Sequence, residues 1–147
     1  MGEMSIVVLH WNIHIRNKYS TKNEIEKIMK RENNIEKFEN ERERLDEIVM
    51  KYANLEMKRF YSLDSQVYRE GALSRKTKEL MGLVASLVLR CDDCIKYHIV
   101  KCHEEEATNE EIVEAMGIAL VIGGSILIPH LRRAFDAWNE LRKSKDG

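Results

Sequence analysis

Two cysteines and a histidine form the stretch of this chain with the greatest capacity for chemistry. Cys91 and Cys94 are three residues apart, and His98 follows four residues after the second thiol. On a helix, residues four apart share a face, so the imidazole can take the proton of the Cys94 thiol. A C-x-x-C pair at a helix N-terminus can close into a disulfide, and the helix dipole favours thiolate over thiol. The stretch therefore predicts a dithiol that cycles to a disulfide.

The order of attack within the pair stays open. Cys94 is the better candidate for the attacking thiolate because His98 can take its proton, and Cys91 would then resolve the sulfenic acid to a disulfide. In many C-x-x-C proteins, however, the N-terminal and more exposed sulfur attacks. Asp92 and Asp93 suit the helix dipole but oppose activation, because a carboxylate beside a thiol disfavours ionisation of that thiol.

Two other interpretations of the same residues predict no redox cycle. In the first, Cys91, Cys94 and His98 join Cys102 or His103 in a zinc site. Cys94 and Cys102 are eight residues apart, which places their Cα atoms about 12 Å apart on one straight helix. Sulfur ligands of one zinc ion lie only about 4 Å apart, so an unbroken helix cannot close this site. In the second, the pair consists of inert core thiols, which is the state we expect for Cys102.

The composition of the chain predicts an all-α fold. The 147 residues include 44% hydrophobic and 33% charged side chains, but only one proline and seven glycines. These are too few turn residues for a many-stranded β fold.

The formal net charge is −1 and no basic stripe is interleaved with aromatic residues, so no nucleic acid partner is expected. The apolar run at 6–9 is too short to span a bilayer, so no membrane partner is expected. Three cysteines do not form a secreted disulfide framework, which favours a cytoplasmic protein.

The periodicity of apolar residues divides the chain into three segments. We expect an N-terminal appendage at 1–20, a charged amphipathic helical arm at 21–56 and a helical domain at 57–147. The helical pattern between 21 and 59 would make a single helix roughly 58 Å long. Because that length exceeds a small domain, we expect a break near Asn33–Asn34 or Asn40, or an arm that reaches across a neighbouring subunit.

Start signals and apolar patterns place the helices of the domain at 60–68, 75–90, 92–106, 108–122 and 125–143. Ser74 can cap the second of them, and Thr108 with Glu111 forms a capping box for the fourth. The fourth helix is almost wholly apolar from Ile112 to Ile122, so we expect it to be buried all round, in the core or at an oligomer interface. The last helix is expected to bury Ile126, Leu127, Leu131, Phe135, Trp138 and Leu141.

The spacing of Glu79, Cys91, Cys94 and His98 resembles the E…C-x-x-C-x-x-x-H signature of AhpD-like alkylhydroperoxidases, in the carboxymuconolactone decarboxylase superfamily. Residues 77–82 and 123–132 are similar to that family as well. The resemblance implies an AhpD-like all-α domain that assembles into homo-oligomers, trimers or hexamers. It also implies thiol-dependent reduction of hydrogen peroxide or organic peroxides by a dithiol reductant, for which lipoyl proteins are a family expectation. No bound metal or other cofactor is implied.

The resemblance also implies roles for the individual residues. Glu79 would be the distal base, acting through water and His98, the proton shuttle. Cys94 would be the peroxidatic thiol, with Cys91 as its partner. Without the resemblance, Glu79 would be taken for a solvent carboxylate at the edge of the buried face of its helix. Better-known members have a histidine directly before the second cysteine, where this chain has Asp93, which removes a proton carrier and adds negative charge beside Cys94.

Two other functions remain as alternatives to a peroxidase. One is a redox-sensing or adaptor protein, in which the state of a switching disulfide changes partner binding and the charged arm forms the partner surface. The other is an enzyme like the carboxymuconolactone decarboxylases themselves. That chemistry needs groups that bind a dicarboxylate and protonate an enol, and the sequence contains no convincing set of them.

Overall fold

All secondary structure in the described part of the chain is helical, as the composition predicted. A computed structural model describes residues 34–145, so the predicted appendage at 1–20 and the first part of the predicted arm lie outside the described residues. The elements are α3 (Asn34–Tyr52), α4 (Leu55–Val67), α5 (Arg75–Leu89), α6 (Asp92–Glu104), α7 (Asn109–Gly123), the 3₁₀ helix η1 (Ser125–Leu127) and α8 (Ile128–Lys145). Within this part, no helix combines the length and hydropathy that a bilayer crossing requires.

Capping residues determine where the domain helices begin. The Ser74 hydroxyl accepts a hydrogen bond from a backbone N–H of the first turn of α5, and Thr108 and Glu111 form both bonds of the capping box at α7. Both caps are confirmed as predicted. Pro129 is the second residue of α8, where its missing N–H would have no partner in the helix. Gly124 closes α7 with a positive φ of 72°, a conformation that favours glycine.

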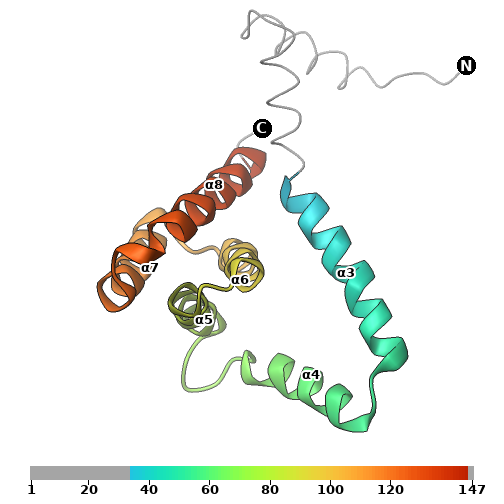
Figure 1. Ribbon diagram of the computed structural model, residues 1–147. Helices are drawn as coiled ribbons and strands as arrows, with labels where there is room; N and C mark the ends of the chain where they lie inside the picture. The colour runs from blue at the N-terminus through green and yellow to red at the C-terminus, as the bar shows by residue number, and fades with distance from the viewer. Residues whose placement is uncertain (1–33, 146–147) are drawn as a thin grey trace, which may run out of the picture.

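The core lies between α5, α6, α7 and α8, which form one packed group in Figure 1. Its large and fully buried side chains are Leu83, Leu87, Ile95, Ile99, Ile112, Met116 and Leu127. Each aliphatic side chain of this size contributes about 1.5–3 kcal/mol when it leaves water. Helices α5 and α6 carry the residues of the candidate site, so the packing of the core fixes the positions of both helices.

Helices α3 and α4 stand away from this core as an open arm (Figure 1). The Glu140 carboxylate of α8 accepts hydrogen bonds from the backbone N–H groups of Asn34 and Ile35, both at 2.9 Å. This contact satisfies donors that a helix N-terminus leaves open. Ile35 is the one buried residue of α3, and α4 has none. At the other end of the arm, the Lys78 Nζ of α5 donates hydrogen bonds to the Val67 and Arg69 carbonyls, so the arm is held at both ends.

The expected break at Asn40 is wrong, because α3 continues through it to Tyr52. The other expected position, Asn33–Asn34, borders the described residues. The chain instead breaks at Ala53 and Asn54, where the Asn54 side chain accepts a hydrogen bond from the Met57 N–H and starts α4. An asparagine that caps the next helix ends the previous one, because the N-cap backbone is extended.

The prediction that the apolar helix is buried all round is wrong for the chain by itself. Ile112, Met116 and Ala119 of α7 are buried, but Val121 is 86% exposed and Ile122 is 65% exposed. In the last helix and η1, the predicted burial of Leu127 and Trp138 is confirmed, whereas Ile126 and Phe135 are exposed. Helix α7 packs through one side only, so its other side remains an apolar surface of the chain.

Candidate functional site

Cys91 and Cys94 form a disulfide at the N-terminus of α6. Cys91 is the N-cap residue, and its Sγ accepts a hydrogen bond of 3.3 Å from the Cys94 N–H. Cys94 is exposed and Cys91 is half-buried, so the pair is open to reagents from solvent. The prediction that the pair lies at a helix start is confirmed. Once the bond is reduced, the open N–H groups and the dipole of the helix favour a thiolate here.

Glu79 of α5 and His98 of α6 meet in the interior, and His98 lies one turn after Cys94 on α6. Glu79 Oε2 lies 2.9 Å from His98 Nδ1, and the two residues are 1% and 8% exposed. The expectation that Glu79 lies at the edge of the buried face of its helix is therefore wrong, and the proximity of Glu79 to His98 that the family resemblance implies is present. A buried carboxylate is stable only with a partner. With Glu79 ionised, the Nδ1–H of the ring donates to it, which leaves Nε2 to exchange a proton elsewhere.

Gly82, one turn after Glu79 on α5, leaves the space that the His98 ring occupies. A Cβ atom at Gly82 would lie 2.5 Å from the ring Cε1 and 2.8 Å from both ring nitrogens. No real Cβ contact is that short, so only a glycine permits this approach of helix and ring. The sequence pattern predicts no role for Gly82, because a glycine within a helix has no pattern of its own.

We expect the Gly82→Ala substitution to move the His98 ring out of line with Glu79. The overlap should lower the free energy of unfolding by about 1–3 kcal/mol. A displaced ring should also slow any reaction that depends on it, on the order of 10²-fold for a shift of 1 Å. Urea unfolding and the rate of peroxide consumption measure the two effects.

Gly117 of α7 provides the matched control for this substitution. A Cβ atom there would have nothing within 4 Å, so Gly117→Ala should stabilise the helix by up to about 1 kcal/mol and leave the rate unchanged. Equal rates in the two alanine variants would contradict the role given to Gly82.

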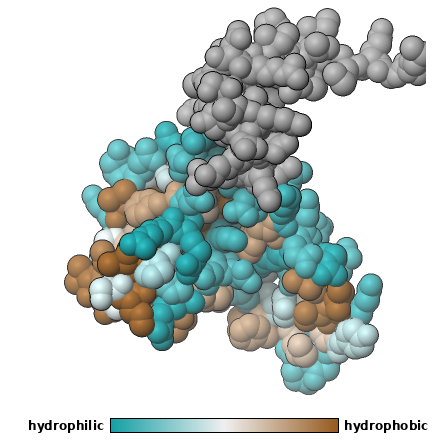
Figure 2. Space-filling model, turned by 45° about the horizontal axis from the view of Figure 1, so that its top comes forward, coloured by the Kyte–Doolittle hydropathy of each residue, from teal (hydrophilic) through white to brown (hydrophobic). Residues whose placement is uncertain are grey.

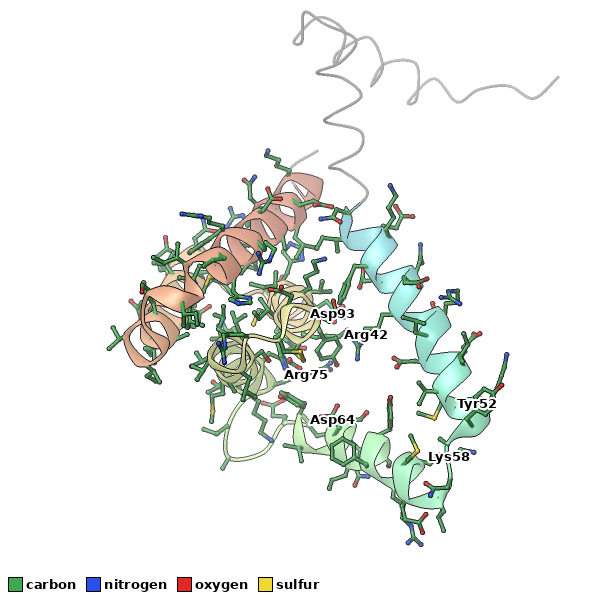
Figure 3. All side chains as sticks on the ribbon, viewed as in Figure 1. Arg42, Tyr52, Lys58, Asp64, Arg75 and Asp93 are labelled. Atoms are coloured by element: carbon green, nitrogen blue, oxygen red, sulfur yellow. A yellow bond between two sulfur atoms is a disulfide. The ribbon has the colours of Figure 1, made fainter. Side chains whose placement is uncertain are left out.

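Two tyrosine rings enclose His98. The Tyr68 ring lies 5.4 Å from the imidazole and the Tyr97 ring lies 5.2 Å from it, centroid to centroid. Burial and the negative charge of Glu79 raise the pKa of Tyr68. The Arg42 guanidinium of α3 lies 3.8 Å above the Tyr97 ring, a favourable cation–π distance, and Figure 3 labels Arg42 on the side of α3 that faces α6. Both helices of the arm thus reach the surroundings of the site.

A second polar cluster, which the sequence pattern did not predict, lies next to Cys91. Asp92 Oδ1 lies 2.7 Å from His130 Nδ1, and both Asp92 oxygens accept hydrogen bonds from Arg133 Nη2 at 2.9–3.0 Å. The i, i+3 spacing of His130 and Arg133 puts them on one face of α8, but only the packing shows which element that face meets. The cluster ties the first residue of α6, and with it the adjacent disulfide, to the start of α8.

The same cluster predicts a pH-dependent contribution to stability. Burial raises the pKa of Asp92, but the His130 and Arg133 hydrogen bonds lower it more, so the pKa lies below its usual value. A lowered pKa stabilises the fold above the unfolded-state value, and this gain is lost as the pH falls through the folded-state value. The Asp92 side chain is 44% exposed, so we expect Asp92→Asn to cost about 1 kcal/mol at neutral pH.

Urea unfolding of Asp92→Asn and the parent at neutral pH and near pH 3 measures this contribution, since about pH 3–4 is where aspartates titrate. The difference between the two proteins should shrink at the lower pH. Asp136→Asn, which changes an exposed carboxylate of α8, should show no such difference. A deficit that is the same at both pH values would contradict the ionic role of Asp92.

Cys102 is a free and fully buried thiol, as expected. Burial, together with the nearby negative charge of Glu79, raises the pKa of this thiol to about 12. A thiol with so high a pKa is an inert small hydrophobe at neutral pH. His103 packs its ring against Trp138 at 5.8 Å. Among residues 34–143, no three His, Cys, Asp or Glu side chains are grouped so as to hold a metal ion.

A family model described as the carboxymuconolactone decarboxylase family matches residues 55–137. Two uncharacterised curated proteins are similar to the chain. One, from the cox locus of Paracoccus denitrificans, is 32% identical over 82 residues, 56% of this chain and 74% of its own. The other, from Cupriavidus necator, is 28% identical over 86 residues, 56% of this chain and 76% of its own.

Solved structures are similar over more of the chain. A Thermotoga maritima protein is 61% identical, with a TM-score of 0.73 over 76% of this chain and 98% of its own. A second crystal structure of that protein describes it as a carboxymuconolactone decarboxylase family protein with a possible involvement in the antioxidative response. A Legionella pneumophila protein described as belonging to the same family is 28% identical, with a TM-score of 0.61 over 76% of this chain and 96% of its own.

Proposed function

This chain belongs to the carboxymuconolactone decarboxylase family, and we propose that it is a thiol-dependent peroxidase that acts through the Cys91–Cys94 dithiol. The observation that carries the proposal is an exposed disulfide sulfur, Cys94, which lies on α6 one turn before His98 of the buried Glu79–His98 pair. The possible involvement in the antioxidative response that is given for the Thermotoga maritima protein supports the same assignment.

The proposed cycle starts from the reduced pair. The Cys94 thiolate attacks one oxygen of the peroxide, so that an S–O bond forms, the O–O bond breaks and the alkoxide leaves with a proton as an alcohol, or as water for hydrogen peroxide. The Cys91 thiol then attacks the resulting sulfenic acid, the S–S bond forms and water leaves. The peroxide is reduced by two electrons and the thiols are oxidised by two.

In this cycle, Glu79 and His98 move the proton of the attacking thiol. The carboxylate holds the ring through Nδ1, so the Nε2 lone pair takes the proton directly or through a water. The rings of Tyr68 and Tyr97 pack against the imidazole. Because Asp93 stands where better-known members carry a histidine, the ring of His98 is the sole imidazole proposed for the relay.

The proposed partners follow from the same chemistry. A dithiol reductant, such as a lipoyl protein, reduces the disulfide by thiol–disulfide exchange at the exposed Cys94 sulfur. The second thiol of the reductant then closes a cyclic disulfide, and the reductant leaves in its oxidised form. We propose a homo-oligomer, a trimer or a hexamer, because large apolar side chains of α4 and α7 are exposed in the single chain. A cytoplasmic location fits a pair that must be kept reduced.

Thiol counting during peroxide addition tests the function directly. One equivalent of hydrogen peroxide added to the reduced protein should remove both thiols of the pair and leave Cys102, which is buried with a raised pKa. With an excess of dihydrolipoamide, peroxide consumption should continue over many cycles. A redox sensor would oxidise once and stop, and a decarboxylase would leave the thiols unchanged. Either of those results would overturn the peroxidase proposal.

A further inference from the structure

Charged side chains lie next to the disulfide at the start of α6. The hydrophobic side chains on the surface gather elsewhere, over α7 at the left and over α4 at the lower right of Figure 2. Charge is therefore the property by which the neighbours of the two sulfurs can act on them. The ionisable groups here are Arg90 at the end of α5, Asp92 and Asp93 in the first turn of α6, the Glu79–His98 pair, and His130 and Arg133 of α8.

The Cys91 sulfur lies at the positive end of α6. Cys91 is the N-cap residue, and its Sγ accepts the hydrogen bond of 3.3 Å from the Cys94 N–H. In the reduced protein, the same N–H and the helix dipole favour a Cys91 thiolate. In the proposed cycle this thiolate attacks the Cys94 sulfenic acid, so that the S–S bond forms and hydroxide leaves and takes up a proton as water. The ionisation of Cys91 therefore affects how fast the disulfide closes.

The Asp92 carboxylate is the group that most directly opposes this ionisation. It belongs to the residue after Cys91, and a carboxylate in the first turn of a helix is drawn to the same positive end. A second negative charge there would disfavour the thiolate. In the structure the carboxylate is instead bound to α8. Asp92 Oδ1 lies 2.7 Å from His130 Nδ1, and Arg133 Nη2 donates hydrogen bonds to Oδ1 and Oδ2 at 3.0 and 2.9 Å.

We propose that Arg133 and His130 are positioning residues for the Cys91 thiol, which hold the Asp92 carboxylate against α8 and neutralise its charge so that the thiolate forms at the start of α6. The guanidinium binds both carboxylate oxygens, a geometry that arginine favours. The side chains of Arg133 and Asp92 are 50% and 44% exposed, so solvent screens the interaction. The expected effect on Cys91 is therefore several-fold rather than many powers of ten.

Each sulfur of the pair then has a support of its own from a different part of the fold. The Glu79–His98 pair, between α5 and α6, serves Cys94, and the Asp92 cluster, between α6 and α8, serves Cys91. The role of Cys91 in closing the disulfide rests on the proposed peroxidase function. The effect of the cluster on the ionisation of Cys91 does not, because it depends only on charge and position.

Alkylation of the reduced protein by iodoacetamide over a range of pH measures the ionisation of each thiol, since the thiolate is the form that reacts. Mass spectrometry of the labelled peptides separates Cys91 from Cys94. In Arg133→Gln, the midpoint of Cys91 alkylation should move to higher pH, and the rate near neutral pH should fall by about 3- to 10-fold. The plateau rate at high pH should keep the parent value, whereas a variant that only disturbed the structure would change access to the sulfur at every pH.

Two comparisons make this result specific. Arg132→Gln removes the neighbouring exposed cation of α8, which points about 100° away from Arg133 around the helix, and it should leave the midpoint unchanged. In an Asp92→Asn background, Arg133→Gln should have little effect, because no carboxylate is left to hold. A Cys91 midpoint that stays at the parent value in Arg133→Gln, or that moves as far in Arg132→Gln or in the Asp92→Asn background, would overturn the proposal.

Trapping with dimedone, a reagent for sulfenic acids, tests the consequence for the proposed cycle. After hydrogen peroxide is added, Arg133→Gln should carry more trapped Cys94 sulfenic acid than the parent, because slower closure leaves the sulfenic acid exposed for longer. Equal trapping in the two proteins would overturn the role in disulfide closure. If neither protein formed a sulfenic acid, the peroxidase function would fail, and the alkylation midpoints would still decide the positioning role.

Discussion

The Cys94→Ser variant is expected to lose peroxide turnover, by on the order of 10³-fold or more, as is typical when the nucleophile of a catalytic unit is removed. The serine hydroxyl is a far weaker nucleophile than a thiolate at neutral pH, and no S–O bond can form on it. The remaining Cys91 thiol lacks a resolving partner three residues away. Steady-state consumption of hydrogen peroxide with dihydrolipoamide as the reductant measures the loss.

Two further cysteine variants make this result specific. Cys91→Ser should still react with peroxide once, because Cys94 can form a sulfenic acid, but it should not return to the reduced state by way of an internal disulfide. Cys102→Ala should keep the parent rate, since that thiol is fully buried and its pKa is about 12. If Cys91→Ser lost the first oxidation and Cys94→Ser kept it, the order of attack would be reversed. Unchanged turnover in Cys94→Ser would defeat the assignment altogether.

The Glu79→Gln variant should lower the rate of peroxide reduction by about 10²-fold or more, the usual size of a general acid–base contribution. The amide is nearly the same size as the carboxylate and can still hydrogen-bond His98 Nδ1, but it cannot stabilise a protonated imidazole by charge. The step that removes the Cys94 proton therefore becomes harder. Single-turnover oxidation followed over a range of pH should show both a slower rate and a changed pH profile.

A stability measurement separates this electrostatic role from a structural one. Glu79 is 1% exposed, so any change there can disturb packing, and the unfolding midpoint of Glu79→Gln must be compared with that of the parent. Glu36→Gln, at an exposed position of α3, serves as the control for loss of one negative charge. A slower rate with an unchanged pH profile would indicate a structural role only.

The sequence by itself determined the features that depend on neighbours along the chain. The caps at Ser74 and at Thr108–Glu111 are local hydrogen bonds, and the all-α class follows from composition and periodicity. Cys91 and Cys94 lie together at the start of α6, as their spacing predicted, because residues three and four apart in a helix lie close to one another. The roles of these residues, the order of attack and the boundaries of the segments at 1–20, 21–56 and 57–147 stay predictions.

Only the tertiary structure decided which faces of the helices meet. Glu79 and His98 are 19 residues apart and Asp92 and His130 are 38 apart, so their contacts depend on the crossing of two helices rather than on local spacing. For the same reason, the single chain buries only one side of α7, and the alternative that the other side lies at an oligomer interface stays a prediction. An apolar pattern states that a surface needs a cover, but it does not state whether that cover belongs to the same chain.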